Sequence, residues 1–182
     1  LFQYTFNSGT GQVLAMKPKD AGPPVGTGPR HIAYHSSLPI VYFSNEQHVG
    51  VSVYDQKSAG QLIFKQLCDV VPKDRSKDGL SASDIVITPD ARFVFSAIRG
   101  RRQNFDRLAG YEVQEDGTLR FLGLTATDGT PWGISLSPNG DYLLVSCFEG
   151  ESLLAYRIES DGSLGRVGRV ELPKYISDLV TY

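Results

Sequence analysis

The chain has 182 residues, and its 18 Lys and Arg against 20 Asp and Glu give a formal net charge of -2. This near-neutral balance offers no whole-protein attraction to nucleic acid or to anionic lipid, so we expect neither nucleic acid nor a membrane as a partner. No apolar run approaches the roughly 20 residues of a membrane-spanning helix. With only two cysteines, Cys68 and Cys147, and with no zinc pattern and no visible secretory signal, the sequence predicts a cytoplasmic protein with buried thiols.

Short runs of β-branched and aromatic residues recur along the chain, each bounded by Gly, Pro, Asn, Asp or Ser. Examples are residues 40–43, 49–54, 92–95 and 142–145. The 19 Gly and 10 Pro residues, and a sequence without long stretches of 3.6-residue period, argue against helices. The pattern predicts an all-β protein.

A hairpin-like unit repeats through the chain, beginning at a tyrosine, turning at a glycine and continuing into a second strand. It starts at Tyr4, Tyr54, Tyr111 and Tyr156, in steps of 50, 57 and 45 residues. Between these units lies a second motif that turns at Pro-Asp or Pro-Asn-Gly, as in residues 133–140. We expect the four tyrosines to pack between neighbouring units.

Four strands in each repeat of about 50 residues are typical of β-propeller blades, with strands a to d counted outward from the central channel. We therefore expect a β-propeller of about three and a half four-stranded blades. Its parts are strands c and d of an incomplete blade at 1–17, blades at 28–71, 80–127 and 130–172, and a closing inner strand at 175–182. Because such an arc leaves sheet faces open, we expect a second chain or a missing N-terminal half to close the ring.

Propeller topology also indicates where functional residues lie. Strands a and b are antiparallel, so the start of strand a and the end of strand b emerge on the same face, around the mouth of the channel. Loops on a rigid scaffold are frequent binding sites. The residues that this rule brings to one mouth are Arg30, His31, Asn45, Glu46, Asp84, Arg99 and Trp132.

A family resemblance rests on four segments near this mouth. They are Gly28-Pro29-Arg30-His31, then Asn45-Glu46, then residues 82–90, then Arg99-Gly100. Together they resemble the seven-bladed propeller lactonases, the family of 6-phosphogluconolactonase and carboxymuconate cyclase. The resemblance extends over the whole chain and implies that it is equivalent to the C-terminal half of a seven-bladed ring. It also implies a catalytic His in an earlier blade, outside this sequence, so we expect the chain alone to be incomplete.

The resemblance implies a lactone hydrolase of the 6-phosphogluconolactonase type, with a small lactone or carboxylate bound at the channel mouth. Glu46 would be the catalytic acid/base, and Arg30 and Arg99 would be catalytic clamps for substrate anions. These roles suit a carboxylate and bidentate guanidinium groups. No metal or other cofactor is implied. Substrate contacts are expected from His31, Asn45, Asp84 and Trp132.

Two alternatives stay open at this point. In the first, the chain is a non-catalytic propeller remnant that serves as a binding or assembly module, and Glu46 merely joins adjacent blades through an ion pair with Arg30. In the second, it is a carboxymuconate-type lactonising cyclase, because lactone formation uses the same carboxylate and arginines as hydrolysis. The first alternative is favoured by Pro131-Trp132, because the lactonases that the chain resembles usually have an arginine in the place of Trp132. The replacement removes a polar group from the mouth.

Overall fold

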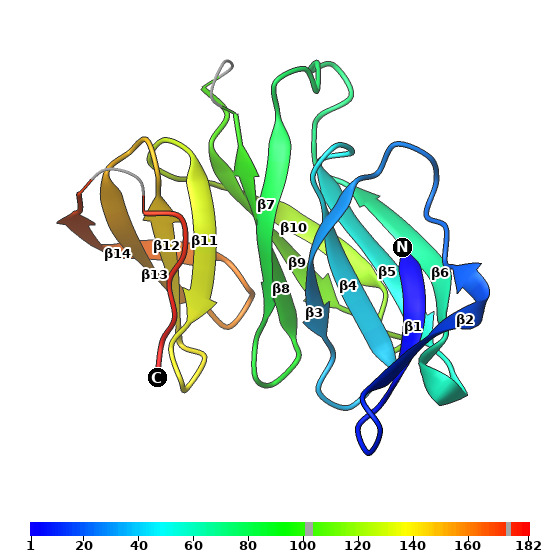
Figure 1. The fold of residues 1–182 in the computed structure, drawn as a ribbon. Helices are drawn as coiled ribbons and strands as arrows, with labels where there is room; N and C mark the ends of the chain where they lie inside the picture. The colour runs from blue at the N-terminus through cyan, green and yellow to red at the C-terminus, as the bar shows by residue number, and fades with distance from the viewer. Residues whose placement is uncertain (101–103, 174–175) are drawn as a thin grey trace.

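The computed structural model describes residues 1–100, 104–173 and 176–182 (for residues 18–20 and 59, the backbone alone), and the described part consists of β-strands and one short 3-10 helix, Ser58–Gly60. An antiparallel hairpin of β1 (Phe2–Asn7) and β2 (Gln12–Asp20) comes first. Three antiparallel sheets of four strands follow, side by side as in a fan (Figure 1).

Each of these sheets forms one blade, and its strands follow one another in sequence order. The first blade consists of β3 (Pro29–Tyr34), β4 (Ile40–Asn45), β5 (Gly50–Gln56) and β6 (Leu62–Asp69). The second consists of β7 (Ser81–Ile87), β8 (Phe93–Arg99), β9 (Arg107–Val113) and β10 (Leu119–Ala126). The third consists of β11 (Pro131–Leu136), β12 (Tyr142–Cys147), β13 (Ser152–Ile158) and β14 (Leu164–Glu171). The prediction of an all-β propeller with about three and a half blades is confirmed.

The hydrophobic core lies between the blades. Strands β4 and β8 are buried along their whole length, and this explains their continuous apolar runs. Blades cover both faces of β8, whereas β4 has the second blade on one face and Leu1 and Ala21 on the other. One apolar cluster joins the first blade to the second and contains Tyr42, Val53 and Tyr111. Another joins the second blade to the third and contains Phe95 and Tyr156. The blades are therefore held together mainly by burial of apolar surface.

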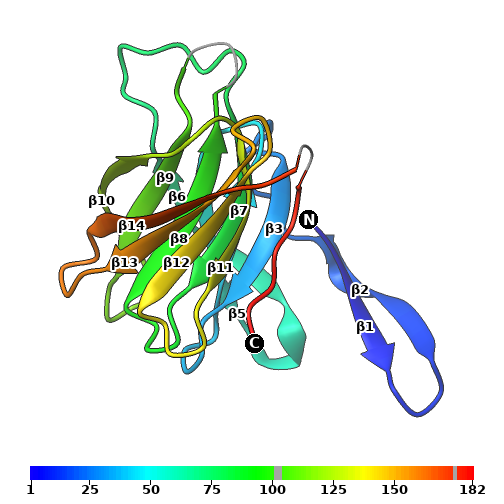
Figure 2. The ribbon, with the colours of Figure 1, turned by 90° about the vertical axis from the view of Figure 1, so that its left-hand side faces the viewer.

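The repeated tyrosines do not all pack as the sequence predicts. Tyr54, Tyr111 and Tyr156 are buried. Tyr4, however, is 53% exposed, and its neighbours Phe2 and Phe6 are exposed too, because the β1–β2 hairpin projects away from the first blade (Figure 2). The prediction that all four tyrosines pack between blades is wrong for Tyr4.

The C-terminal segment also differs from the prediction. Residues 176–182 run beside β11 but form no strand (Figure 1). The backbone of Ser177 and Asp178 lies against Gly133, and Thr181 Oγ1 donates to the Leu136 carbonyl and lies 3.1 Å from Ser135 Oγ. A closing strand needs a backbone ladder with a partner strand, and residues 176–182 form no such ladder in the described part of the chain. The predicted start of that strand, Lys174 and Tyr175, lies outside the described residues. Among the described residues, no helix has the length and apolar character to span a membrane.

Each inner strand carries the same irregularity in its pairing. In the first blade, Pro29 pairs with Asn45 but Ile32 pairs with Phe43, so β3 holds one extra residue. The same shift occurs in β7 and in β11. A bulge of this kind bends the strand and redirects side chains. It places two residues from each blade at the rim of the channel: Arg30 and His31, Ser83 and Asp84, and Trp132 and Gly133.

Candidate functional site

An ion pair between the first two blades forms one side of the candidate site. Glu46 follows β4 and Arg99 ends β8, and their Oε1 and Nη2 atoms are 2.6 Å apart. The two blades are also joined here by the backbone, because the Ala82 N–H donates to the Glu46 carbonyl at 3.3 Å. The Arg99 side chain is only 9% exposed, whereas that of Glu46 is 45% exposed. Water and a ligand can therefore reach the carboxylate while its partner stays fixed.

The indole of Trp132, from the third blade, lies against both arginines. The Arg99 guanidinium carbon is 4.4 Å from the ring centroid and that of Arg30 is 5.8 Å from it. Phe148 packs on the same indole at a centroid distance of 5.1 Å. A guanidinium over an aromatic face is a favourable cation–π contact. Trp132 thus brings side chains from all three blades together, beside a small cavity of about 120 Å³ that it lines with Arg99.

Next to this stack, three polar side chains form a chain of hydrogen bonds. Arg30 Nη1 donates to His31 Nε2 at 2.9 Å and to the Ser83 carbonyl at 3.1 Å. His31 Nδ1 lies 2.7 Å from Asp84 Oδ1. Because a guanidinium can only donate, His31 Nε2 is the acceptor, and a neutral His31 therefore carries its proton on Nδ1 and donates it to Asp84.

Asp84 is fixed by backbone groups of two blades. Its Oδ1 accepts the Ile85 N–H at 2.8 Å, and its Oδ2 accepts the Ile134 N–H of β11 at 3.0 Å. With His31 on the other side, the carboxylate links the inner strands of all three blades. The Asp84 side chain is 13% exposed, so its first role in the structure is to orient its neighbours.

Asn45 is the predicted site residue that the structure keeps away from the others. It is fully buried, and its Oδ1 accepts the Ser52 hydroxyl at 3.1 Å, within the first blade. Asn45 ends β4 on the ladder itself, paired with Pro29, so its side chain points into the sheet stack rather than to the mouth. The structure connects the other six predicted residues in the two contact sets described above.

Sequence reasoning did not find the residues that shape the bulges. The Ser44 hydroxyl accepts the His31 N–H at 3.1 Å and donates to the Ser83 carbonyl at 3.0 Å. Ser146 holds Gly133 in the corresponding place of the third blade, at 3.0 Å from its N–H. Both serines precede the last residue of strand b, and this repeated position was the signal available in the sequence.

The site offers two guanidinium groups, one accessible carboxylate and one imidazole in one connected set of side chains. This set can hold an anion and can move a proton to or from bound water. Among the described residues, no group of three or more His, Cys, Asp and Glu side chains has the arrangement of a metal site.

Comparison with known proteins gives the same fold. The protein-family model for the seven-bladed β-propeller lactonases matches residues 1–177. The periplasmic gluconolactonase of Pseudomonas aeruginosa superimposes with a TM-score of 0.81 at 24% identity, over 90% of this chain and 45% of that one. A candidate 6-phosphogluconolactonase from Bacteroides fragilis gives a TM-score of 0.83 at 22% identity, over 96% and 49%.

A similar protein from Bacteroides uniformis gives a TM-score of 0.82 at 21% identity, over 94% of this chain and 48% of that one. The chain thus spans about half the length of these solved structures. At such identities the structural likeness shows the fold alone, whereas the family model matches nearly every residue. The chain therefore belongs to the family of seven-bladed β-propeller lactonases.

Proposed function

We propose that this chain contributes the channel mouth of a lactone hydrolase of the 6-phosphogluconolactonase type. The ring would be completed by a second chain or by an N-terminal half. Membership of the lactonase family supports the reaction class. The observation that carries the proposal is the stack of Glu46, Arg99 and Trp132, with Arg30 on the same indole.

In the proposed reaction, Glu46 accepts a proton from water, and the resulting hydroxide adds to the lactone carbonyl. The negative charge that develops on the carbonyl oxygen is stabilised by a guanidinium of Arg30 or Arg99. The ring C–O bond then breaks, and the leaving alkoxide takes the proton back from Glu46. The 45% exposure of Glu46 supports this role, because water must reach the carboxylate.

A second candidate function is a non-catalytic binding or assembly module. It is favoured by one observation: Glu46 Oε1 is already bonded to an almost buried Arg99, which is the arrangement of a structural ion pair between blades. In that case the stack stabilises the arc of blades and takes no part in chemistry.

Hydrolysis of 6-phosphogluconolactone, followed as acid release at constant pH, tests the proposal. The chain is assayed alone and with the complementary half-ring of a family member. Glu46→Gln is expected to lower kcat by roughly 100-fold or more, whereas Glu112→Gln on β9, outside the candidate site, leaves it unchanged. Equal rates for wild type and Glu46→Gln would favour the module. Lactone formation from a muconate, without hydrolysis, would identify a cyclase.

The ring-closing partner has its own test, the solution mass by light scattering. A dimer of this chain supports closure by a second copy, and a monomer that binds an N-terminal half-ring supports closure by that half. A chain that neither dimerises nor binds an N-terminal half-ring would contradict this part of the proposal.

A further inference from the structure

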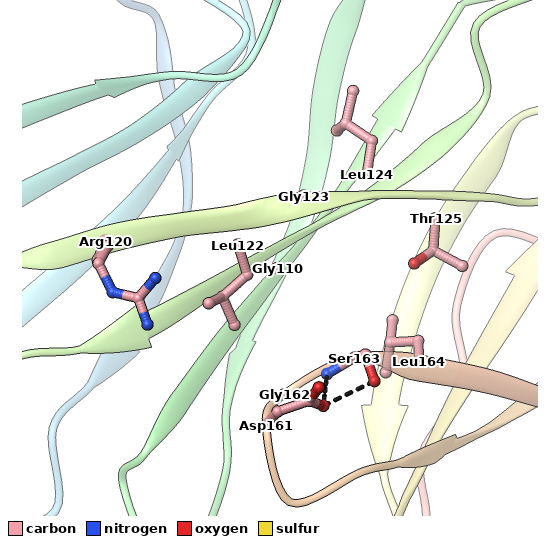
Figure 3. A pocket seen from close by; sticks show the side chains of 10 residues that line it. All are labelled: Gly110, Arg120, Leu122, Gly123, Leu124, Thr125, Asp161, Gly162, Ser163 and Leu164. Atoms are coloured by element: carbon pink, nitrogen blue, oxygen red, sulfur yellow. Dashed lines mark hydrogen bonds between the residues drawn. The ribbon is translucent and has the colours of Figure 1, made fainter.

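A pocket of about 430 Å³ lies between the second and third blades (Figure 3), and none of its lining residues belongs to the candidate site at the channel mouth. One wall is β10, with Leu122, Gly123 and Leu124, and the other is the turn at 161–164 between β13 and β14. The corresponding space at the other two seams is filled by a glutamine side chain, which this seam lacks.

At the other two seams, a glutamine side chain bonds the backbone of a leucine on the facing blade. That leucine lies two residues after the glycine of a turn. At the seam between the first and second blades, Gln66 Oε1 accepts the Leu119 N–H at 2.8 Å, and Nε2 donates to the Leu119 carbonyl at 2.9 Å. At the seam between the β1–β2 hairpin and the first blade, Gln3 Oε1 accepts the Leu62 N–H at 2.6 Å. A carboxamide that pairs with a leucine backbone is thus a repeated feature.

Gln3 and Gln66 occupy two different positions in their blades. At the seam between the second and third blades, both positions are occupied by glycine, at Gly110 and Gly123. Gln66 pairs with Val53 across the first blade, and its counterpart Gly123 pairs with Gly110 across the second. Gly110 also precedes Tyr111 as Gln3 precedes Tyr4. A Cβ added at Gly123 would meet nothing within 4 Å, so the place of the missing side chain is open.

The leucine at this seam is Leu164, and its backbone faces the pocket. Its partner in the ladder is Ile158, whose N–H donates to the Asp141 carbonyl, on the opposite side from β14. In antiparallel pairing this makes Ile158 and Leu164 a non-hydrogen-bonded pair, so the Leu164 N–H and C=O point outward. They present the same donor and acceptor that Leu119 presents to Gln66.

A cationic group is replaced at the same seam. Lys65, next to Gln66, donates to the Asp116 carbonyl at 2.6 Å and lies 3.6 Å from its carboxylate. The residue in the place of Lys65 is Leu122, while the aspartate remains, as Asp161. The Ser163 hydroxyl and N–H, both bonded to Asp161 Oδ1, lower the pKa of that carboxyl, which is therefore anionic at neutral pH.

We infer that this pocket is a binding site for a small ligand that carries a primary carboxamide and a cationic amine. The carboxamide pairs with the backbone of Leu164, as Gln66 pairs with Leu119. The amine lies near Asp161, as Lys65 lies near Asp116. The ligand's methylene groups contact Leu122 and Leu124. The site is separate from the channel mouth and does not depend on lactone hydrolysis.

The test is an NMR titration of the ¹⁵N-labelled chain with acetyl-Lys-Gln-methylamide, which carries both groups. We expect saturable shifts of the Gly110, Gly123 and Leu164 amides, with a dissociation constant of roughly 1 mM, as suits so small a ligand. The matched peptides Lys-Glu and norleucine-Gln each lack one group, and each should bind at least roughly fivefold more weakly. Absence of saturable shifts with Lys-Gln would overturn the inference.

Gly110→Gln places the missing side chain inside the pocket and should abolish the shifts. Its Cβ is accommodated, because the nearest atom, on Phe95, is 3.4 Å away. Gly22→Gln, at an exposed glycine elsewhere, is the matched control and should bind as wild type does. Binding retained in Gly110→Gln would place the peptide elsewhere and refute the assignment. If Gly110→Gln does not fold, Asp161→Asn must weaken binding of Lys-Gln but not of norleucine-Gln; equal effects on both would refute it.

Discussion

The imidazole of His31 and the carboxylate of Asp84 join the inner strands of two blades, with Nδ1 and Oδ1 2.7 Å apart. The same carboxylate accepts two backbone N–H groups, one of them from the third blade. A single side chain thereby sets the relative position of three inner strands. It also orients His31, which in turn holds the Arg30 guanidinium.

Asp84→Asn should destabilise the fold. An amide presents one oxygen and one NH2 group, so it cannot accept from both backbone N–H groups with the same geometry, and one buried donor loses its partner. The expected cost is roughly 1–3 kcal/mol in the free energy of unfolding, measured by urea denaturation. Asp74→Asn, at an exposed aspartate, should change it by no more than about 0.5 kcal/mol. Equal stability of both variants would contradict the bridging role.

Arg99→Ala should be visible in the fluorescence of Trp132, the single tryptophan of the chain. The substitution removes the guanidinium that covers the indole at 4.4 Å, so water gains access and the emission maximum moves to longer wavelength. Arg120→Ala serves as the control, because Arg120 pairs with Glu112 on the outer strands. An unchanged spectrum in Arg99→Ala would show that the indole is not covered by Arg99 in solution.

Stability should fall at low pH partly through Asp128. Burial raises the pKa of this carboxyl, but hydrogen bonds from Ser152 and Arg169 and the charge of Arg166 outweigh that effect, and the pKa is lowered in the folded state. A lowered folded pKa gives stability that is complete above the unfolded value of about 4 and is lost as pH falls through the folded value. Asp128→Asn should therefore destabilise the protein at pH 7 and much less at pH 2. A stability difference independent of pH would contradict this origin.

The two cysteines should be inert in the folded protein. Burial raises the pKa of both the Cys68 and the Cys147 thiols to about 12, and neither forms a disulfide. Since the thiolate is the reactive form, iodoacetamide at pH 8 should leave native protein unmodified and alkylate both thiols in urea. Intact-mass measurement distinguishes the two results, and rapid alkylation of the native chain would contradict the burial of these side chains.

Gln66→Ala should weaken the seam between the first and second blades. It leaves the N–H and C=O of Leu119, a 5% exposed residue, without the carboxamide that both now contact. We expect a loss of roughly 1–3 kcal/mol in the free energy of unfolding. Gln12→Ala, at an exposed position of β2, should have little effect, and a loss of equal size there would indicate a general effect of strand substitution.

The sequence predicts the blades because their strands show in the chain as apolar runs separated by turn residues. Residues 93–95 of the run at 92–95, for example, begin β8 and are buried there. It also predicts which residues approach the channel, because the start of strand a and the end of strand b must meet. Both predictions depend on local pattern and topology, which a single sequence contains.

What the sequence could not predict are contacts between side chains of different blades. The non-catalytic alternative pairs Glu46 with Arg30, but the carboxylate pairs with Arg99, while Arg30 bonds His31 and the Ser83 carbonyl. The choice between the two arginines depends on the bulge at 29–32, which turns Arg30 along the rim. The burial of Asn45 has no signature in residue type alone.

The recurring bulge of the inner strands makes the mouth open to redesign by directed evolution. Pairing resumes in register after the extra residue in every blade, although the bulge residues are as different as Arg30, Ser83 and Trp132. The same backbone course is thus compatible with three different side chains at the first bulge position. The partly exposed Arg30 and Trp132 could be randomised together to give new binding specificities, whereas Ser83 and Asp84 would be kept because they bond neighbouring blades.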